Sequence, residues 1–88
     1  FPLTVRDNSP KNRNEIVQIL NDKGIGTRLL FAGNLIRQPA FIDAPRRVVG
    51  ELKYTDQVMK DTFWIGVWPG LTDEMLQYTA QSIEEALK

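Results

Sequence analysis

The fold is decided by one apolar run, Thr62-Phe63-Trp64-Ile65-Gly66-Val67-Trp68, which is dense in aromatic and β-branched residues. Such residues favour a pleated, half-buried backbone, so the run predicts a strand over residues 62–68. We expect most of its side chains to pack in the core rather than to form a ligand platform. Trp68 stands beside the Pro69-Gly70 break that ends the run, and it is expected at the rim of the sheet.

Two amphipathic helices are expected to accompany this strand. The first spans residues 13–23, because Asn12 and Glu15 form an approximate capping box at its start. Gly24 follows and suits the left-handed position at a helix C-terminus. The second helix begins after Thr72, a capping residue, and runs to the end of the chain. Its inward stripe is predicted to comprise Met75, Leu76, Thr79, Ile83, Ala86 and Leu87.

The rest of the chain has shorter patterns. They predict strands over residues 1–5 and 25–31, a helical turn over 35–40, a loop over 42–54 with an extended piece at 46–49, and a short helix over 54–60. Thr55 is the expected cap of that short helix. Strands separated by helices predict one small α/β domain, a sandwich in which a three-stranded sheet carries helices on a face.

The composition excludes several kinds of site. The 88 residues include no Cys and no His, which removes disulfides, zinc–thiolate sites, a cysteine nucleophile and the usual general base. Eleven basic residues balance eleven acidic ones, and neither half has the bias of a nucleic-acid-binding arm. No apolar run approaches the ~18–20 residues of a membrane span, and no secretory signal is visible. We therefore expect no nucleic-acid or membrane partner. Because the first residue is Phe1 rather than Met, we interpret the chain as part of a longer protein.

Residues 26–41 carry the strongest signals for ligand binding. Arg28 lies near the end of a predicted strand, where a guanidinium can bind phosphate or carboxylate with two hydrogen bonds. Phe31 can stack on a flat ring, Gly33 lets a backbone approach a ligand closely, and the helical turn that follows offers free N–H groups to an anion. The ordinary alternative stays open: Arg28 pairs with a nearby acid, Phe31 lies in the core and Gly33-Asn34 forms a turn.

Two other charged pairs are weaker candidates for a functional site. Arg46-Arg47 is expected to be a solvated pair in a loop. Asp73 and Glu74 are adjacent on a helix and point in different directions, so we do not expect an acid–base pair there. No nucleophile elbow, phosphate-binding loop or dinucleotide fingerprint is present.

Several of these motifs together resemble the C-terminal small domain of the DegT/DnrJ/EryC1/StrS family, pyridoxal-phosphate enzymes with the fold of aspartate aminotransferase (fold type I). The matching stretches are residues 24–28, Phe31, Gln38-Pro39-Ala40-Phe41, residues 64–69 and residues 71–75. The resemblance covers nearly the whole chain and implies an α+β sandwich with a small, mostly antiparallel sheet. Residues 27–35 with 37–41, and residues 61–67 with 69–72, are most similar to the 3-dehydrase branch, which acts on CDP-4-keto-6-deoxyglucose in lipopolysaccharide biosynthesis.

This resemblance implies that residues 1–88 are the single C-terminal small domain of a longer nucleotide-sugar C3 dehydrase. The missing large domain would bind pyridoxal phosphate (PLP) or its amine form (PMP), and a His there would replace the Schiff-base Lys of the aminotransferases. The resemblance further implies a cytoplasmic homodimer, a nucleotide-sugar substrate and, for the CDP-type enzyme, an iron–sulfur cluster upstream and a reductase partner. The isolated 88 residues are expected to be inactive and to bind no cofactor.

In that setting the domain would close one side of the substrate cleft. The expected substrate contacts are Arg28, Phe31, Asn34, Arg37 and Gln38. Family aminotransferases often have a His two residues before the Gln-Pro pair, and Ile36 at that position favours the dehydrase branch. Three alternatives stay open: the same domain of a nucleotide-sugar aminotransferase, a stand-alone anion-binding or interaction module, and a purely structural domain of a dimer. CDP and GDP also stay open as the nucleotide.

Overall fold

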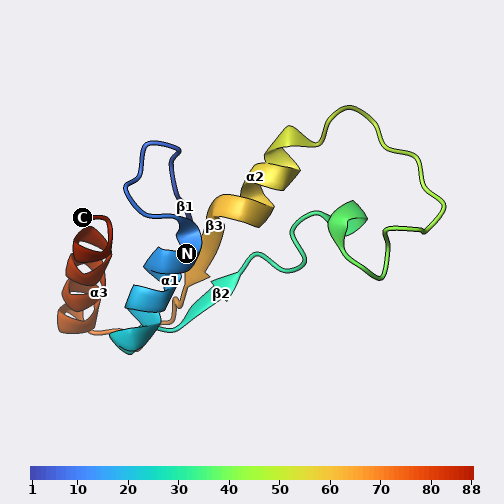
Figure 1. Cartoon of the computed structure of the whole chain (residues 1–88). Coiled ribbons are helices and arrows are strands. Elements are labelled where there is room, and N and C mark those ends of the chain that lie inside the picture. Colours follow the sequence, from blue (N-terminus) through green and yellow to red (C-terminus); the bar gives the residue numbers. More distant parts are fainter.

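The computed structural model describes all 88 residues and contains three short strands, three α-helices and one 3-10 turn (Figure 1). In chain order these are β1 (Pro2–Thr4), α1 (Arg13–Asp22), β2 (Thr27–Leu29), η1 (Leu35–Arg37), α2 (Lys53–Asp61), β3 (Thr62–Ile65) and α3 (Asp73–Ala86). The strands form one sheet in the order β1-β3-β2, and both outer strands run antiparallel to β3. The predicted α+β class and the small antiparallel sheet are therefore confirmed.

The core lies on one face of the sheet and is centred on Phe63 of β3, which is 2 % exposed. Phe63 packs in one cluster with Ile16 and Leu20 of α1 and Ala86 of α3. Side chains alternate along a strand, so the next residue, Trp64, points to the opposite face. That second face carries no hydrophobic residue of the core cluster.

The central strand is shorter than predicted. It ends at Ile65 rather than at residue 68, because β1 and β2 are only three residues long and offer no ladder partner beyond that point. Val67 and Trp68 are consequently exposed, so the expectation that most of residues 62–68 pack in the core is wrong for its second half. The expected rim position of Trp68 is confirmed.

The start of α1 matches the prediction closely. The Glu15 amide donates to Asn12 Oδ1 at 3.1 Å, and the Asn12 amide donates to Glu15 Oε2 at 2.8 Å, which completes the capping box. Gly24 has a φ of +78°, as expected of the residue that ends such a helix.

The predicted inward stripe of α3 is only partly confirmed. The cap is Thr72, whose hydroxyl accepts from the Met75 amide at 3.2 Å. Met75, Leu76 and Leu87 are exposed, and the buried positions are Ser82 and Ala86. The reason is length: a helix of fourteen residues spans ~21 Å, whereas a strand of four covers ~13 Å, so the sheet is too small to cover every apolar residue of α3.

The chain between β2 and β3, residues 30–61, extends away from α1 and α3 (Figure 1). We call this stretch, which includes η1 and α2, the arm. β2 is shorter than the predicted strand over 25–31, because Phe31 has a φ of +49° and its amide donates to the Leu29 carbonyl at 2.8 Å. The predicted helical turn is the 3-10 turn η1, which is shorter than expected. Residues 46–49 lie in a loop, as expected, and join no strand of the sheet.

The entry into α2 also differs from the prediction. The helix begins at Lys53, and its N-cap is Leu52, which has a left-handed φ of +54° and makes no side-chain cap. Thr55 lies inside the helix, so its assignment as the cap was wrong.

The arm has almost no core of its own. Neither η1 nor α2 contains a buried residue. The radius of gyration is 15.6 Å, against about 12 Å expected for 88 residues in a globular domain, and the arm accounts for this elongation. None of the helices is long and apolar enough to cross a membrane.

The one-sided core predicts a large difference between two phenylalanines. Phe63→Ala removes the buried centre of the cluster and is expected to lower the free energy of unfolding by about 3–5 kcal/mol. Phe31→Ala, at a side chain that is 81 % exposed, is expected to cost less than about 1.5 kcal/mol. Denaturant unfolding of the two variants, followed by circular dichroism, measures the difference. Equal losses of unfolding free energy in the two variants would contradict the placement of the core on the face of the sheet that packs against α1 and α3.

Candidate functional site

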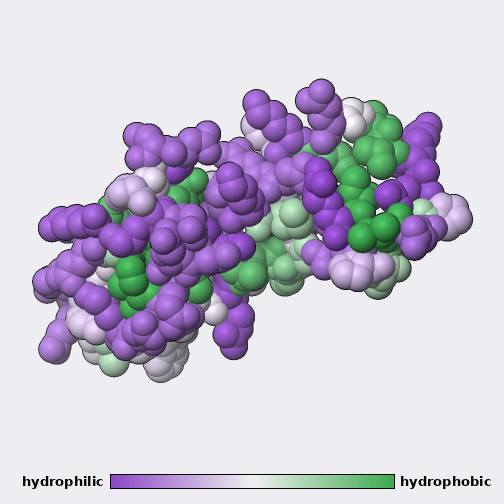
Figure 2. Space-filling view, in the orientation of Figure 1, coloured by the Kyte–Doolittle hydropathy of each residue, from purple (hydrophilic) through white to green (hydrophobic).

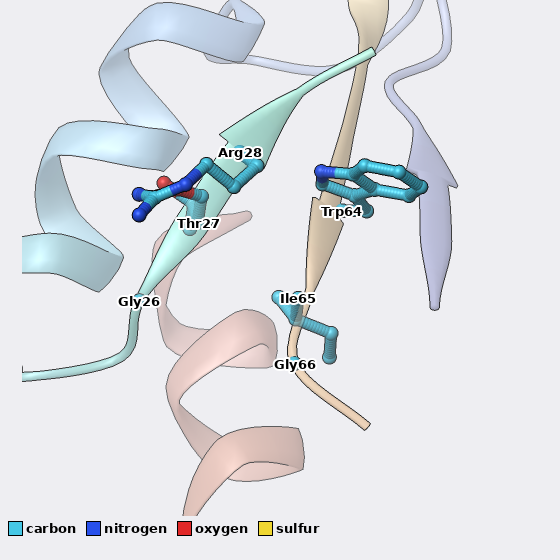
Figure 3. Close-up of a pocket in the computed structure, with 6 residues that line it drawn as sticks. All are labelled: Gly26, Thr27, Arg28, Trp64, Ile65 and Gly66. Atoms are coloured by element: carbon cyan, nitrogen blue, oxygen red, sulfur yellow. The ribbon is translucent and has the colours of Figure 1, made fainter. Parts of the chain in front are cut away.

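The face of the sheet opposite the core is the candidate site. We call it the bare face and define it by Pro2, Thr4, Arg28 and Trp64, which alternate with the core-facing residues of their strands. Thr62 lies on the same side of β3 but is buried. A shallow hollow of about 390 Å³ lies where β2 begins and β3 ends (Figure 3). Its lining residues are Gly26, Thr27, Arg28, Trp64, Ile65 and Gly66.

Arg28 is the free cation of this site. It lies directly across the ladder from Trp64, and its side chain extends over Thr27, away from the indole (Figure 3). Its guanidinium makes one hydrogen bond, from Nη1 to the Thr27 carbonyl at 3.1 Å, and takes part in neither salt bridge of the chain. The alternative in which Arg28 pairs with a nearby acid is therefore wrong. Most of its donors remain available for an external anion.

Phe31 lies on the surface beside Trp64. The two rings meet edge to face, with centroids 5.3 Å apart and planes at 79°. Because Phe31 is so exposed, the alternative that places it in the core is wrong. The pair presents aromatic surface on one side of the Arg28 backbone, while the guanidinium extends over Thr27 on the other side. A ligand long enough to reach both would need a flat ring at one end and a negative charge at the other.

Asn34 and Arg37 are joined through a carboxylate of α2. Asn34 Nδ2 donates to Asp56 Oδ1 at 2.8 Å, and Arg37 donates from Nε to Oδ1 at 2.5 Å and from Nη2 to Oδ2 at 2.7 Å. Asn34 Oδ1 also accepts from the Ile36 amide at 3.3 Å. Asn34 is 2 % exposed, so a ligand on the surface reaches little of it. Arg37 is exposed, and its Nη1 is not used by Asp56.

Gln38 and Gly33 shape the same segment. Gln38 Nε2 donates to the Ala32 carbonyl at 2.6 Å, which closes the turn around η1 and leaves the Gln38 side-chain oxygen free. Gly33 has a φ of +68°, and a Cβ added there would lie 2.3 Å from Met59 Cγ. The close approach that Gly33 permits is therefore to α2 and not to a ligand, which corrects the expectation from sequence. The N-terminus of η1 is likewise capped by Asn34 rather than open to an anion.

The electrostatics of the segment follow from these contacts. Hydrogen bonds from Arg37 and then Asn34 hold the pKa of Asp56 at about 2, well below the usual range of a carboxyl group. The same contact raises the pKa of Arg37. A second ion pair, Lys23–Glu85, joins α1 to α3, and its hydrogen bond lowers the pKa of Glu85.

Other charged groups do not form a second site. Arg46 is not simply solvated: its Nη1 donates to the carbonyls of Phe41, Ile42 and Ala44, and so it closes the loop after η1. Arg47 is exposed, as expected. No group of three or more acidic side chains gathers closely enough to hold a metal ion.

Two residues of the site were missed by the sequence analysis. Trp64 was assigned to the core, because an aromatic run does not reveal which face of its strand is covered. Asp56 received no role, although it joins two of the five predicted site residues. It is the acidic residue in the first turn of α2, which is an ordinary position for Asp. Its partners lie 19 and 22 residues away, so local sequence gives no signal of them.

The comparisons with known proteins cover nearly the whole chain. The model of the DegT/DnrJ/EryC1/StrS aminotransferase family matches residues 1–84. The lipopolysaccharide biosynthesis protein RfbH of Salmonella typhimurium is 56 % identical over 85 residues, which are 97 % of this chain and 20 % of that protein. The dTDP-4-dehydro-2,6-dideoxy-D-glucose 3-dehydratase of Saccharopolyspora spinosa is 42 % identical over 85 residues, 97 % of this chain and 18 % of that protein. The chain thus spans about a fifth of the length of these relatives.

The depressed pKa of Asp56 predicts a pH dependence. The folded-state pKa of about 2 lies below the ~3.9 of an unfolded Asp, so the Arg37–Asp56 contact stabilises the fold fully above about pH 5. That contribution is lost as the pH falls from about 4 to 2. Carboxyl chemical shifts of Asp56, followed by NMR between pH 6 and 1.5, are expected to give a midpoint near 2. A midpoint near 4 would mean that the contact does not form in solution.

Proposed function

The chain belongs to the DegT/DnrJ/EryC1/StrS aminotransferase family, and we propose that it is the C-terminal small domain of a nucleotide-sugar C3 dehydrase. In this proposal the parent enzyme removes the C3 hydroxyl of a 4-keto-6-deoxyhexose attached to a nucleoside diphosphate, for lipopolysaccharide or O-antigen synthesis. The domain closes one side of the substrate cleft with its bare face and arm.

The names of the relatives support the choice of reaction. The Salmonella protein is named for lipopolysaccharide biosynthesis, and the Saccharopolyspora protein is named as a 3-dehydratase of a nucleotide-linked keto sugar. The identities of 56 % and 42 % are counted over 85 residues, 97 % of this chain. Ile36, in the position where family aminotransferases often have a His, favours the same branch.

The observation that carries the role of the domain is an exposed arginine without an acidic partner, Arg28, at the strand position directly across the ladder from Trp64. The ring of Trp64 in turn meets that of the exposed Phe31. Arg28 supplies charge-assisted donors, and Phe31 with Trp64 supplies aromatic surface. A nucleoside diphosphate sugar has matching chemistry, since it carries a diphosphate anion and a flat base. We therefore propose that Arg28 and Phe31 contact this substrate directly.

The other three predicted residues act at the same site in different ways. Arg37 retains a free Nη1, and Gln38 retains a free side-chain oxygen, so both can still contact the substrate. Asn34 is almost completely buried, and its role is to shape η1. In this proposal Arg28 on β2 and three positions of residues 31–38 contact the substrate, and Asn34 holds residues 31–38 in shape.

The exposed surface supports a domain that is covered by further polypeptide. The accessible area is 6925 Å², about 1,600 Å² more than expected for a monomer of 10.1 kDa. A standard protein interface takes ~800 Å² from each partner. Figure 2 shows hydrophobic surface gathered on the arm and near its junction with the sheet. We propose that the large domain of the same enzyme and a second subunit cover it.

The cofactor of the family does not fit the residues of this chain. A pyridoxal cofactor needs an enclosed site with a Lys or His at its reactive carbon, but this chain has no His, and none of its five lysines is buried. Lys23 is already paired with Glu85. The cofactor therefore belongs to the rest of the enzyme, and no step of its chemistry is assigned to these residues. An iron–sulfur cluster would likewise need cysteines from outside the chain.

A nucleotide-sugar aminotransferase is the second candidate, because the family model carries that description. The two reactions differ at the residue that faces the cofactor in the large domain. The sequence of the complete open reading frame is expected to show His at that position, as a dehydrase requires. A Lys would overturn the dehydrase assignment in favour of transamination, and a frame that encodes no large domain would favour a stand-alone binding module.

The role of Arg28 is tested in the complete enzyme. Arg28→Ala removes charge-assisted hydrogen bonds worth about 1.5–3 kcal/mol, so KM for the nucleotide sugar is expected to rise about 10- to 100-fold. Arg6→Ala is the matched control, since Arg6 is exposed and lies outside the bare face. Steady-state kinetics on both variants decide the matter. Equal KM values for the two would remove Arg28 from the substrate site.

A further inference from the structure

The carboxylate of Asp56 is the point where the segment Phe31–Gln38 is fastened to the rest of the domain. It accepts three hydrogen bonds, one from Asn34 and two from Arg37, and so contacts both ends of the short stretch that forms η1. Hydrogen bonds that involve a charged group are roughly twice as strong as neutral ones. Asp56 is therefore the strongest polar connection between this segment and α2.

Few other contacts fix the position of this segment. The edge-to-face contact of Phe31 with Trp64 ties its first residue to the sheet, but the Phe31 ring is mostly exposed. The only buried residue of the segment is Asn34 itself, and its side chain depends on Asp56. Gln38 bonds to Ala32, which lies within the same segment and fixes its shape but not its position. Gly33 packs against Met59 of α2, but a glycine contributes little apolar area. Without the carboxylate, little would hold the segment at a fixed place.

The position of Asp56 is in turn set by the core. α2 runs directly into β3, the strand that carries Phe63. Arg13 of α1 fastens this junction, because its Nη1 donates to the Met59 carbonyl at 3.2 Å and to the Thr62 carbonyl at 3.1 Å. The chain of contacts therefore runs from the core through α2 to Asp56 and from there to the candidate substrate contacts.

We propose that Asp56 is a positioning residue that holds Phe31, Arg37 and Gln38 in place to receive the nucleotide-sugar substrate. It acts through Asn34 and Arg37 and does not itself meet the ligand, since its oxygens are directed to those side chains. The role of the segment as a substrate contact rests on the function proposed above. The fastening of the segment by Asp56 rests on the geometry alone, and it can be measured separately.

The test uses Asp56→Asn in the complete enzyme, with Glu85→Gln as the matched control. The first variant keeps the shape but removes the charge and one acceptor from the Arg37 contact; the second does the same to the Lys23–Glu85 pair on the other side of the domain. For Asp56→Asn we expect amide hydrogen exchange in residues 31–38 to become at least 10-fold faster, KM to rise about 5- to 20-fold and kcat to change less than twofold. Glu85→Gln is expected to leave all three unchanged.

Asp56→Glu is the second variant, because it keeps the carboxylate on a longer side chain. It is expected to restore most of the exchange protection and to give a KM between those of Asp56→Asn and the natural enzyme. If exchange in residues 31–38 is unchanged in Asp56→Asn, the positioning role fails, whatever the kinetics of Arg28→Ala show. If exchange becomes faster but KM is unchanged in Asp56→Asn and in Arg28→Ala, the proposed substrate site fails while the fastening by Asp56 stands.

Discussion

Everything in this domain depends on the burial of one side chain, Phe63, between the sheet and the pair α1 and α3. A sheet of three short strands is stable only when one face packs against helices, and Phe63 is the centre of that contact. Its neighbour Trp64 must then point the other way. The same alternation places Arg28 beside Trp64, so the packing of the core determines which charged and aromatic groups face outward.

The arm is held by a different kind of force. It adds no buried hydrophobic residue to the core, so its order relies on polar contacts from Arg13, Asp56 and Arg46. Such contacts are individually weak when they are exposed, and salt screens them. A segment held in this way can adapt when a ligand or another part of the protein covers it. A rigid core and an adaptable arm meet at the junction of α2 and β3.

The sequence predicted the parts of the fold that local signals determine. Capping residues defined the starts of α1 and α3, and Gly24 defined the end of α1. Predictions failed where tertiary partners decide the outcome: β3 stops at Ile65 because its neighbours stop, and α2 starts at Lys53, after Leu52, without a side-chain cap. The residues of the candidate site divide in the same way between local signals and tertiary contacts. Arg28 and Phe31 were predicted as site residues because of their side-chain chemistry and their place near the end of a predicted strand. The contact between Arg37 and Asp56 joins residues 19 apart in the sequence, so no local pattern indicated it.

The distribution of buried and exposed apolar groups supports our proposal that these residues are one domain of a larger enzyme. An independent domain is expected to bury most of its large apolar residues, and here Phe31, Tyr54, Trp68 and Val49 are all exposed. Only four hydrophobic residues are fully buried among 88. The uncovered side chains lie mostly on the arm and beyond the end of β3, which are two separate places on the surface. A large domain of the same chain and a second subunit would cover both places, whereas a single small ligand would not.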